Sequence, residues 1–176
     1  PNVFMRSLAT RRSHLATSES LLPILSLLKA SSFDLILVET AGIGQSDTEI
    51  TDLADLSVYV MTPEYGASTQ LEKIDMIDYA DCIVINKFDK PGAEDALDAV
   101  RKQYRRSHLK FDDPVESLPV FGIVANRFND KGTNWFYFRL LELLKEKALV
   151  DWTRKSSVSH SVSKTDELIP ASRKHY

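Results

Sequence analysis

Residues 82–89 of the chain read Cys-Ile-Val-Ile-Asn-Lys-Phe-Asp, a short apolar run that is followed at once by polar and charged residues. A run of this length is typical of a strand that is buried on both faces, as strands of parallel sheets are. The sequence Phe-Asp-Leu-Ile-Leu-Val at 33–38 has the same character. From these two runs and similar apolar segments around them, we expect strands at 3–6, 33–39, 56–61, 82–86 and 119–124.

Helical patterns lie between these strands. The clearest is an apolar stripe that recurs at intervals of three and four residues from Ala93 to Tyr104. Apolar residues with helical spacing also occur at 21–28, 71–77 and 135–148. Strands that alternate with helices predict an α/β fold, in which a mostly parallel sheet is covered by helices on both faces.

Composition narrows the function classes. The 176 residues suffice for one globular domain with a sizeable core, and the net charge of −3 gives no basic field for nucleic acid. The single cysteine, Cys82, excludes an internal disulfide, and no apolar run approaches the roughly 20 residues that span a bilayer. We therefore expect a cytoplasmic protein that binds neither nucleic acid nor membrane.

The sequence Asn86-Lys87-Phe88-Asp89 has the N-K-x-D form at the end of a predicted strand. Guanine carries two adjacent donors, its N1–H and its 2-amino group, and the two oxygens of Asp89 can accept both hydrogen bonds. Adenine has an acceptor at the equivalent ring position, and a site of this kind can reject the wrong partner by roughly 10⁴-fold. The stem of Lys87 can lie along the base, and Asn86 can tie the loop to nearby backbone. The competing interpretation is a charged turn after a strand.

A second motif, Glu39-Thr40-Ala41-Gly42, follows the predicted strand at 33–39. GTPases commonly carry D-x-x-G here, where the acidic residue holds a water of the Mg²⁺ shell and the glycine N–H meets the γ-phosphate. Glu39 and Gly42 are the corresponding candidates, and a simple turn is the alternative. A weaker candidate is Ala125, whose backbone N–H would contact the base oxygen; a generic loop is equally consistent with that sequence.

The chain contains no G-x-x-x-x-G-K-[ST] loop to hold the β- and γ-phosphates. We expect that loop and the first switch to lie before Pro1, so that the fold is incomplete at its N-terminus and this piece alone does not hydrolyse GTP. Residues 1–150 are then the C-terminal part of a GTPase domain. Residues 151–176, which are rich in Ser and Lys up to 165, are expected to be a linker and the start of a following domain.

The sequence Val-Glu-Thr-Ala-Gly-Ile-Gly-Gln-Ser at 38–46 resembles the V-E-T-x-G-x-G-Q-[SG] signature of the MeaB/ArgK-like G-protein chaperones. These GTPases, of the P-loop type, serve methylmalonyl-CoA mutase and its relatives, and glutamate is their usual residue where Glu39 stands. The segments 2–11, 59–67, 70–76 and 127–130 are similar to the G domain of fused isobutyryl-CoA mutases, in which cobalamin domain, G domain and mutase barrel share one polypeptide. The resemblance covers residues 1 to about 144, with a weaker echo at 168–170, and it implies that the domain that begins within 151–176 is a mutase domain.

The resemblance implies a mobile third switch loop at 62–73, with Pro63, Glu64, Gln70 and Lys73 as its candidate residues; an ordinary strand-to-helix loop is the alternative. It also implies GTP and Mg²⁺ as cofactors, adenosylcobalamin bound by other domains, and a homodimer. GTP binding and hydrolysis would then order or release the switch loops and so gate cofactor loading and protection of the mutase.

Two other functions remain open at this point. A metal-insertion GTPase would share the N-K-x-D motif but usually carries clustered Cys and His ligands, whereas this chain has one Cys and four dispersed His. A non-catalytic adaptor domain that only joins two mutase domains is the other alternative.

Overall fold

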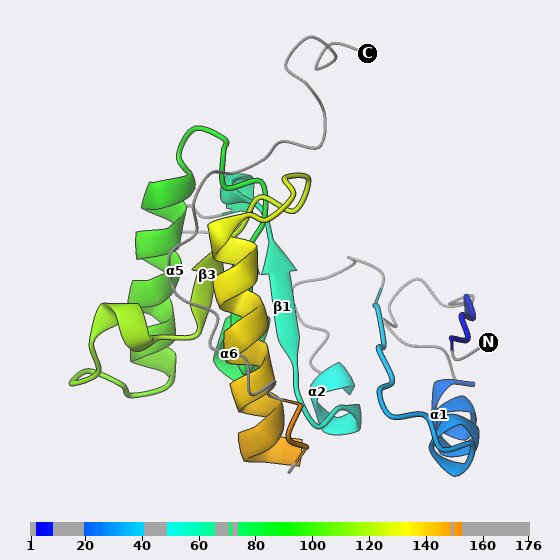
Figure 1. Cartoon of the computed structure of the whole chain (residues 1–176). Helices are drawn as coiled ribbons and strands as arrows, with labels where there is room; N and C mark the ends of the chain where they lie inside the picture. Colours follow the sequence, from blue (N-terminus) through cyan, green and yellow to red (C-terminus); the bar gives the residue numbers. More distant parts are fainter. Residues whose placement is uncertain are drawn as a thin grey trace, which may run out of the picture.

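The computed structural model describes residues 3–8, 20–40, 49–65, 71, 74–148 and 150–152. Its centre is a parallel three-stranded sheet with the strand order β1-β2-β3 (Figure 1). In the register, Val60 of β1 lies beside Val84 of β2, and Ile85 of β2 lies beside Gly122 of β3. The strands are β1 (Val58–Met61), β2 (Cys82–Ile85) and β3 (Val120–Gly122).

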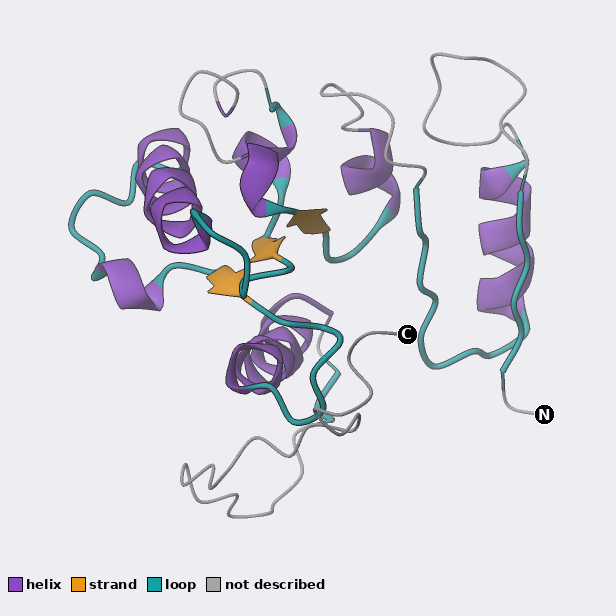
Figure 2. Ribbon diagram, turned by 90° about the horizontal axis from the view of Figure 1, so that it is seen from above, coloured by secondary structure: helices purple, strands orange, loops and turns teal. Residues whose placement is uncertain are grey.

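Helices cover both faces of this sheet, as the sequence predicts. Helix α5 (Ala93–Ser107) and the short α4 (Met76–Tyr79) lie on one face, and α6 (Lys131–Ala148) lies on the other (Figure 2). Within the described residues, no helix has the length and apolar content needed to cross a membrane.

Successive residues of β2 supply both halves of the core, because side chains alternate between the faces of a strand. Ile83 and Ile85 pack with α4 and α5, where Val100 is fully buried. Cys82 and Val84 point to the other face and pack with residues of β3 and α6. All four residues of β2 are buried, which confirms the expectation of a strand covered on both sides.

The predictions for the N-terminal region were partly wrong. Helix α1 (Leu21–Ala30) forms, with Pro23 in its first turn, where proline is tolerated. Residues 3–6 and 33–39 form no strand in the described part of the chain, and the trace at 35–40 runs extended without strand pairing (Figure 1). Leu35 and Leu37 are 50% and 85% exposed. A strand needs neighbours that accept and donate its backbone hydrogen bonds, and an apolar sequence by itself does not provide them. Figure 1 shows the segment 33–40 apart from β1.

Three further boundaries differ from expectation. A short helix, α2 (Glu49–Leu53), has no counterpart in the prediction. Of the expected apolar helix at 71–77, the described part consists of Leu71, in helical conformation, and the turn of α4; Leu71, Ile74 and Ile77 are all buried. Helix α6 begins four residues before the predicted start, and residues 153–176, with the predicted linker, lie outside the described residues.

Candidate functional site at the carboxyl edge of the sheet

The loops that follow the three strands meet at one edge because the strands are parallel. Two backbone hydrogen bonds continue the sheet into these loops. The N–H of Asn86 donates to the carbonyl oxygen of Met61 at 2.8 Å, and the N–H of Ile123 donates to that of Ile85 at 2.9 Å. The start of the N-K-x-D segment is therefore fixed between the ends of β1 and β3.

The side chain of Asn86 joins two of these loops. Its Oδ1 atom accepts the N–H of Lys87 at 2.7 Å and the N–H of Ala125, in the loop after β3, at 3.2 Å. Lys87 has a φ of 57°, in the left-handed region that a non-glycine residue seldom adopts. The amide oxygen of Asn86 thus stabilises a sharp change of chain direction, as the sequence predicts for this residue.

Phe88 anchors the segment from the other side. Its N–H donates to the carbonyl oxygen of Ile123 at 3.0 Å, and its ring lies against Gly122, where an added Cβ would be only 2.4 Å from the ring. Gly122 is not among the site residues predicted from the sequence. A glycine inside a predicted strand is the signal that could have indicated this close approach.

Asp89 follows as an exposed carboxylate that has no hydrogen-bond or ion-pair partner in the described structure. Directly after it, the N–H of Lys90 donates to the carbonyl oxygen of Lys87 at 3.0 Å and closes the turn. Gly92, with a φ of 77°, then leads into α5. The carboxylate therefore lies on an ordered turn with both oxygens available.

Asp130, a second residue that the sequence analysis did not single out, orders the neighbouring loop. Its Oδ2 atom accepts the N–H of Val124 at 3.2 Å and both the N–H and the hydroxyl of Thr133, at 2.8 and 2.9 Å. The contacts with Thr133 cap α6, which explains why this helix starts at Lys131. An Asp three residues before a Thr at the start of an apolar helix was the available sequence signal.

The candidates of the predicted third switch are only partly described. Pro63 and Glu64 lie in a 3₁₀ turn, η1 (Pro63–Tyr65), directly after β1, whereas Gln70 and Lys73 lie outside the described residues. Hydrogen bonds from the Thr62 side chain and from its own backbone lower the pKa of Glu64, and the positive charges of Lys87 and Lys90 lower it further. The positive charges of Lys87 and Lys90, in and beside the N-K-x-D turn, therefore act on the start of the 62–73 segment.

Glu39 is exposed at the end of the extended segment 33–40, and Gly42 lies outside the described residues. In the described structure, Glu39 has no hydrogen bond or ion pair with the N-K-x-D segment. The structure thus assembles Asn86, Phe88 and Ala125 at one edge with Asp89 beside them, and it does not bring Glu39 into contact with them.

Other reactive groups contribute little to this edge. Among the described residues, no group of three or more His, Cys, Asp or Glu side chains is arranged to hold a metal ion. Burial raises the pKa of the Cys82 thiol to about 12, so this side chain is a neutral part of the core.

Comparison with known proteins agrees with this geometry. Residues 1–131 match the model of the family described as methylmalonyl-CoA mutase-associated GTPase MeaB. The chain is 50% identical over all of its 176 residues to a fused isobutyryl-CoA mutase of Geobacillus kaustophilus, and 49% identical over 149 residues (85% of the chain) to one of Cupriavidus metallidurans. It spans 16% and 14% of the length of these two relatives.

The chain is also similar, at lower identity, to proteins whose names mention a GTPase and no mutase. Over 94 residues, or 53% of the chain, it is 40% identical to a protein of Pyrococcus abyssi that is named as a GTPase, and the match covers 29% of that protein. The match to the MeaB family model covers most of the chain, residues 1–131. The chain belongs to the MeaB family of GTPases associated with methylmalonyl-CoA mutase.

Proposed function

We propose that this chain is the guanine-recognising part of a GTPase that acts as the chaperone of an adenosylcobalamin-dependent acyl-CoA mutase on the same polypeptide. The observation that carries the nucleotide assignment is the carboxylate of Asp89, exposed and without a partner on an ordered turn at the carboxyl edge of a parallel sheet. The similarity to fused isobutyryl-CoA mutases supports the mutase assignment.

In this proposal the N-K-x-D residues divide the work. Asp89 accepts hydrogen bonds from N1–H and the 2-amino group of guanine, and the stem of Lys87 lies along the face of the base. Asn86 holds the turn through Lys87 and Ala125 and so positions Asp89. Phe88 contributes packing against Gly122.

A direct contact of Ala125 with the base oxygen is less simple than the sequence suggests. Its N–H already donates to Asn86 Oδ1 at 3.2 Å, which is at the long end of the range for such bonds. In the proposed complex, Ala125 shares this donor between Asn86 and the base or gives up the bond to Asn86.

Glu39 is the proposed Mg²⁺-side residue. An exposed carboxylate suits a hard cation, and Mg²⁺ is commonly held by one or two carboxylates, several waters and the phosphates of the nucleotide. The ion would supply positive charge for the γ-phosphate oxygens, with Gly42 as the backbone donor next to them. This division of roles needs no cluster of protein ligands.

The proposal also covers the division of the chain into domains, the switch segment, the cofactor and the oligomeric state. Residues 1–150 form the GTPase part, 151–176 lead to the mutase part, and the segment 62–73 reports nucleotide state to it. GTP turnover then gates loading of adenosylcobalamin, which other domains bind, in a cytoplasmic homodimer. The piece by itself, without a phosphate-binding loop, is not expected to hydrolyse GTP.

The substitution Asp89→Asn in the complete polypeptide tests the base assignment. One acceptor becomes a donor, so affinity for GDP should fall on the order of 100-fold or more, and affinity for xanthosine diphosphate should rise. Titration with fluorescent analogues of both nucleotides measures this. Asp112→Asn, at another exposed aspartate, is the matched control and should leave both affinities unchanged. Equal GDP affinity of wild type and Asp89→Asn would contradict the assignment.

A further inference from the structure

Gly122 is the last residue of β3 and lies in register beside Ile85, the last residue of β2. Its φ is not positive, unlike that of Gly92, so the backbone conformation does not require glycine here. A glycine weakens a strand, because it has no side chain to pack. The other reason for a glycine in a strand is the close approach of a second group.

That group is the ring of Phe88, the third residue of the N-K-x-D turn. A Cβ added to Gly122 would lie within 2.6 Å of the Cγ, Cδ2 and Cε2 atoms of the ring. Side chains alternate along a strand, so position 122 faces the same side of the sheet as Val120, where Phe88 packs against the core. The ring therefore occupies the space that a side chain at 122 would fill.

Gly122 is also held from the other face of the sheet. Gly132, in the first turn of α6, lies so close to the carbonyl oxygen of Gly122 that an added Cβ would overlap that atom. Strand β3 packs against both α5 and α6. The end of β3 has no room to withdraw, so a larger residue at 122 would have to displace the ring of Phe88.

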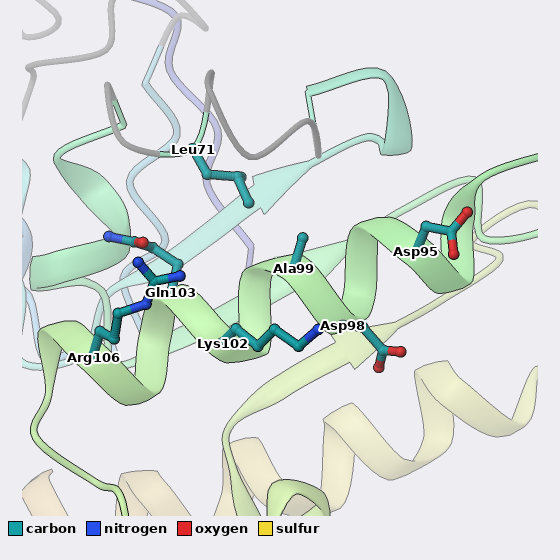
Figure 3. A pocket seen from close by; sticks show the side chains of 7 residues that line it. All are labelled: Leu71, Asp95, Asp98, Ala99, Lys102, Gln103 and Arg106. Carbon is teal, nitrogen blue, oxygen red and sulfur yellow. The ribbon is translucent and has the colours of Figure 1, made fainter.

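Helix α5 fixes the far end of the turn. It packs on the sheet with its apolar side, where Val100 and Tyr104 are buried. Its other side, with Asp95 and Lys102, is exposed and borders a surface pocket beside Leu71 (Figure 3). The turn thus runs from the end of β2 to the start of α5, and the ring of Phe88 is its side-chain contact with β3.

A displaced ring would move Asp89, which is the next residue. The N–H of Phe88 donates to the carbonyl oxygen of Ile123 at 3.0 Å, so both the backbone and the ring of Phe88 lie against the end of β3. Two hydrogen bonds to one base need both carboxylate oxygens in place, and such bonds weaken steeply when they are misaligned.

We infer that Gly122 is a positioning residue for guanine recognition. Because it carries no side chain, the ring of Phe88 can lie on the end of β3 and hold the Asp89 carboxylate where both oxygens reach the base. This inference rests on the proposed function and adds a residue that acts through Phe88 and does not touch the nucleotide.

Affinities of the complete polypeptide for GDP and inosine diphosphate, measured by competition with a fluorescent GDP analogue, test the inference. Inosine diphosphate keeps the N1–H of the base and lacks the 2-amino group. The ratio of the two affinities therefore reports the second hydrogen bond to Asp89, whereas a loss of folded protein lowers both affinities alike. We expect Gly122→Ala to lower this ratio about tenfold.

Shortening the side chain at 88 should remove the effect, since the ring is what the added methyl group meets. Phe88→Ala alone should lower the ratio about twofold, and adding Gly122→Ala to it should lower the ratio no further. In the Phe88→Leu background the methyl group still meets a branched side chain, so Gly122→Ala should lower the ratio about threefold. This background serves if Gly122→Ala alone does not fold.

Leu143→Ala is the control for stability, because it removes a buried side chain of α6 from the cluster on the opposite face and should leave the ratio unchanged. An unchanged ratio in Gly122→Ala would overturn the inference. So would equal losses from Gly122→Ala in the Phe88→Leu and Phe88→Ala backgrounds, or an equal loss in Leu143→Ala. The proposed function fails separately: a wild-type ratio near one, or a ratio that Asp89→Asn leaves intact, would contradict guanine recognition by Asp89 itself.

Discussion

The sheet with α4, α5 and α6 and the N-terminal region with α1 and the segment 33–40 differ sharply in how they use apolar residues. In β2, Ile83 and Ile85 are fully buried beneath α4 and α5, and Cys82 and Val84 are buried on the other face beneath α6. In the N-terminal segment, Leu35 and Leu37 are half exposed or more, although the local sequence is as apolar as that of β2.

The difference lies in the neighbours and not in the residues. Strand β2 has a hydrogen-bonded strand on each side, so its apolar side chains are held over a surface that helices can cover. The segment 33–40 has no such neighbour in the described chain. Burial of this segment would therefore depend on a strand that pairs with it.

Truncation of one apolar side chain in each region should show this difference most clearly. We expect Ile83→Ala to lower the free energy of unfolding by about 4 kcal/mol, since it opens a cavity at a fully buried position. Leu37→Ala should change it by no more than about 0.5 kcal/mol in this chain, because Leu37 is 85% exposed. Urea titration followed by tryptophan fluorescence measures both values. A large cost for Leu37→Ala in a longer chain would show that residues outside this one cover it.

The packing of the sheet region can also be tested by adding a methyl group. A Cβ on Gly132 would lie 1.9 Å from the carbonyl oxygen of Gly122, a backbone atom that cannot move aside. We expect Gly132→Ala to destabilise the fold by about 3 kcal/mol, although alanine is the better helix former. Gly92→Ala, where the added methyl meets open space and only the positive φ opposes it, should cost about 1 kcal/mol in the same titration. Equal costs would mean that α6 is free to shift away from β3.

A smaller effect is expected from alkaline pH, and it should originate in the sheet region. Burial raises the pKa of Cys82 from 9.0 and that of Tyr104 from 10.0, each to about 12. Folding favours the neutral forms, so this stability is complete below about pH 9 and is lost as the pH rises toward 12, by at most about 1.4 kcal/mol per pH unit for each group. Urea titrations at several pH values check this. Tyr104→Phe should make the loss above about pH 10 less steep, and an unfolding free energy that stays constant from about pH 9 to 11 would contradict the prediction.

The core elements were predictable because their signals are local. The apolar run of β2 predicts a strand buried on both faces, and the stripe from Ala93 to Tyr104 predicts a helix with one buried face. The structure confirms both elements and their buried residues. The segment 33–39 carried the same signal and did not form a strand here, since strand pairing depends on residues distant in sequence.

For the candidate site, the sequence indicated residue types that chemistry requires but not the contacts that place them. Asn86 was predicted to tie the loop, and its bonds to Lys87 and Ala125 confirm that role. The contribution of Asp130 escaped prediction because one of its three bonds reaches back to Val124, across a loop whose shape the sequence does not state.

The exposed extended segment also has a consequence for handling the protein. Its sequence, Phe-Asp-Leu-Ile-Leu-Val at 33–38, combines high β-propensity, one charge and no proline, the composition of segments that stack into fibrils. In concentrated stocks this stretch should favour self-association, because its unpaired backbone groups can form strand hydrogen bonds with the same stretch of another molecule.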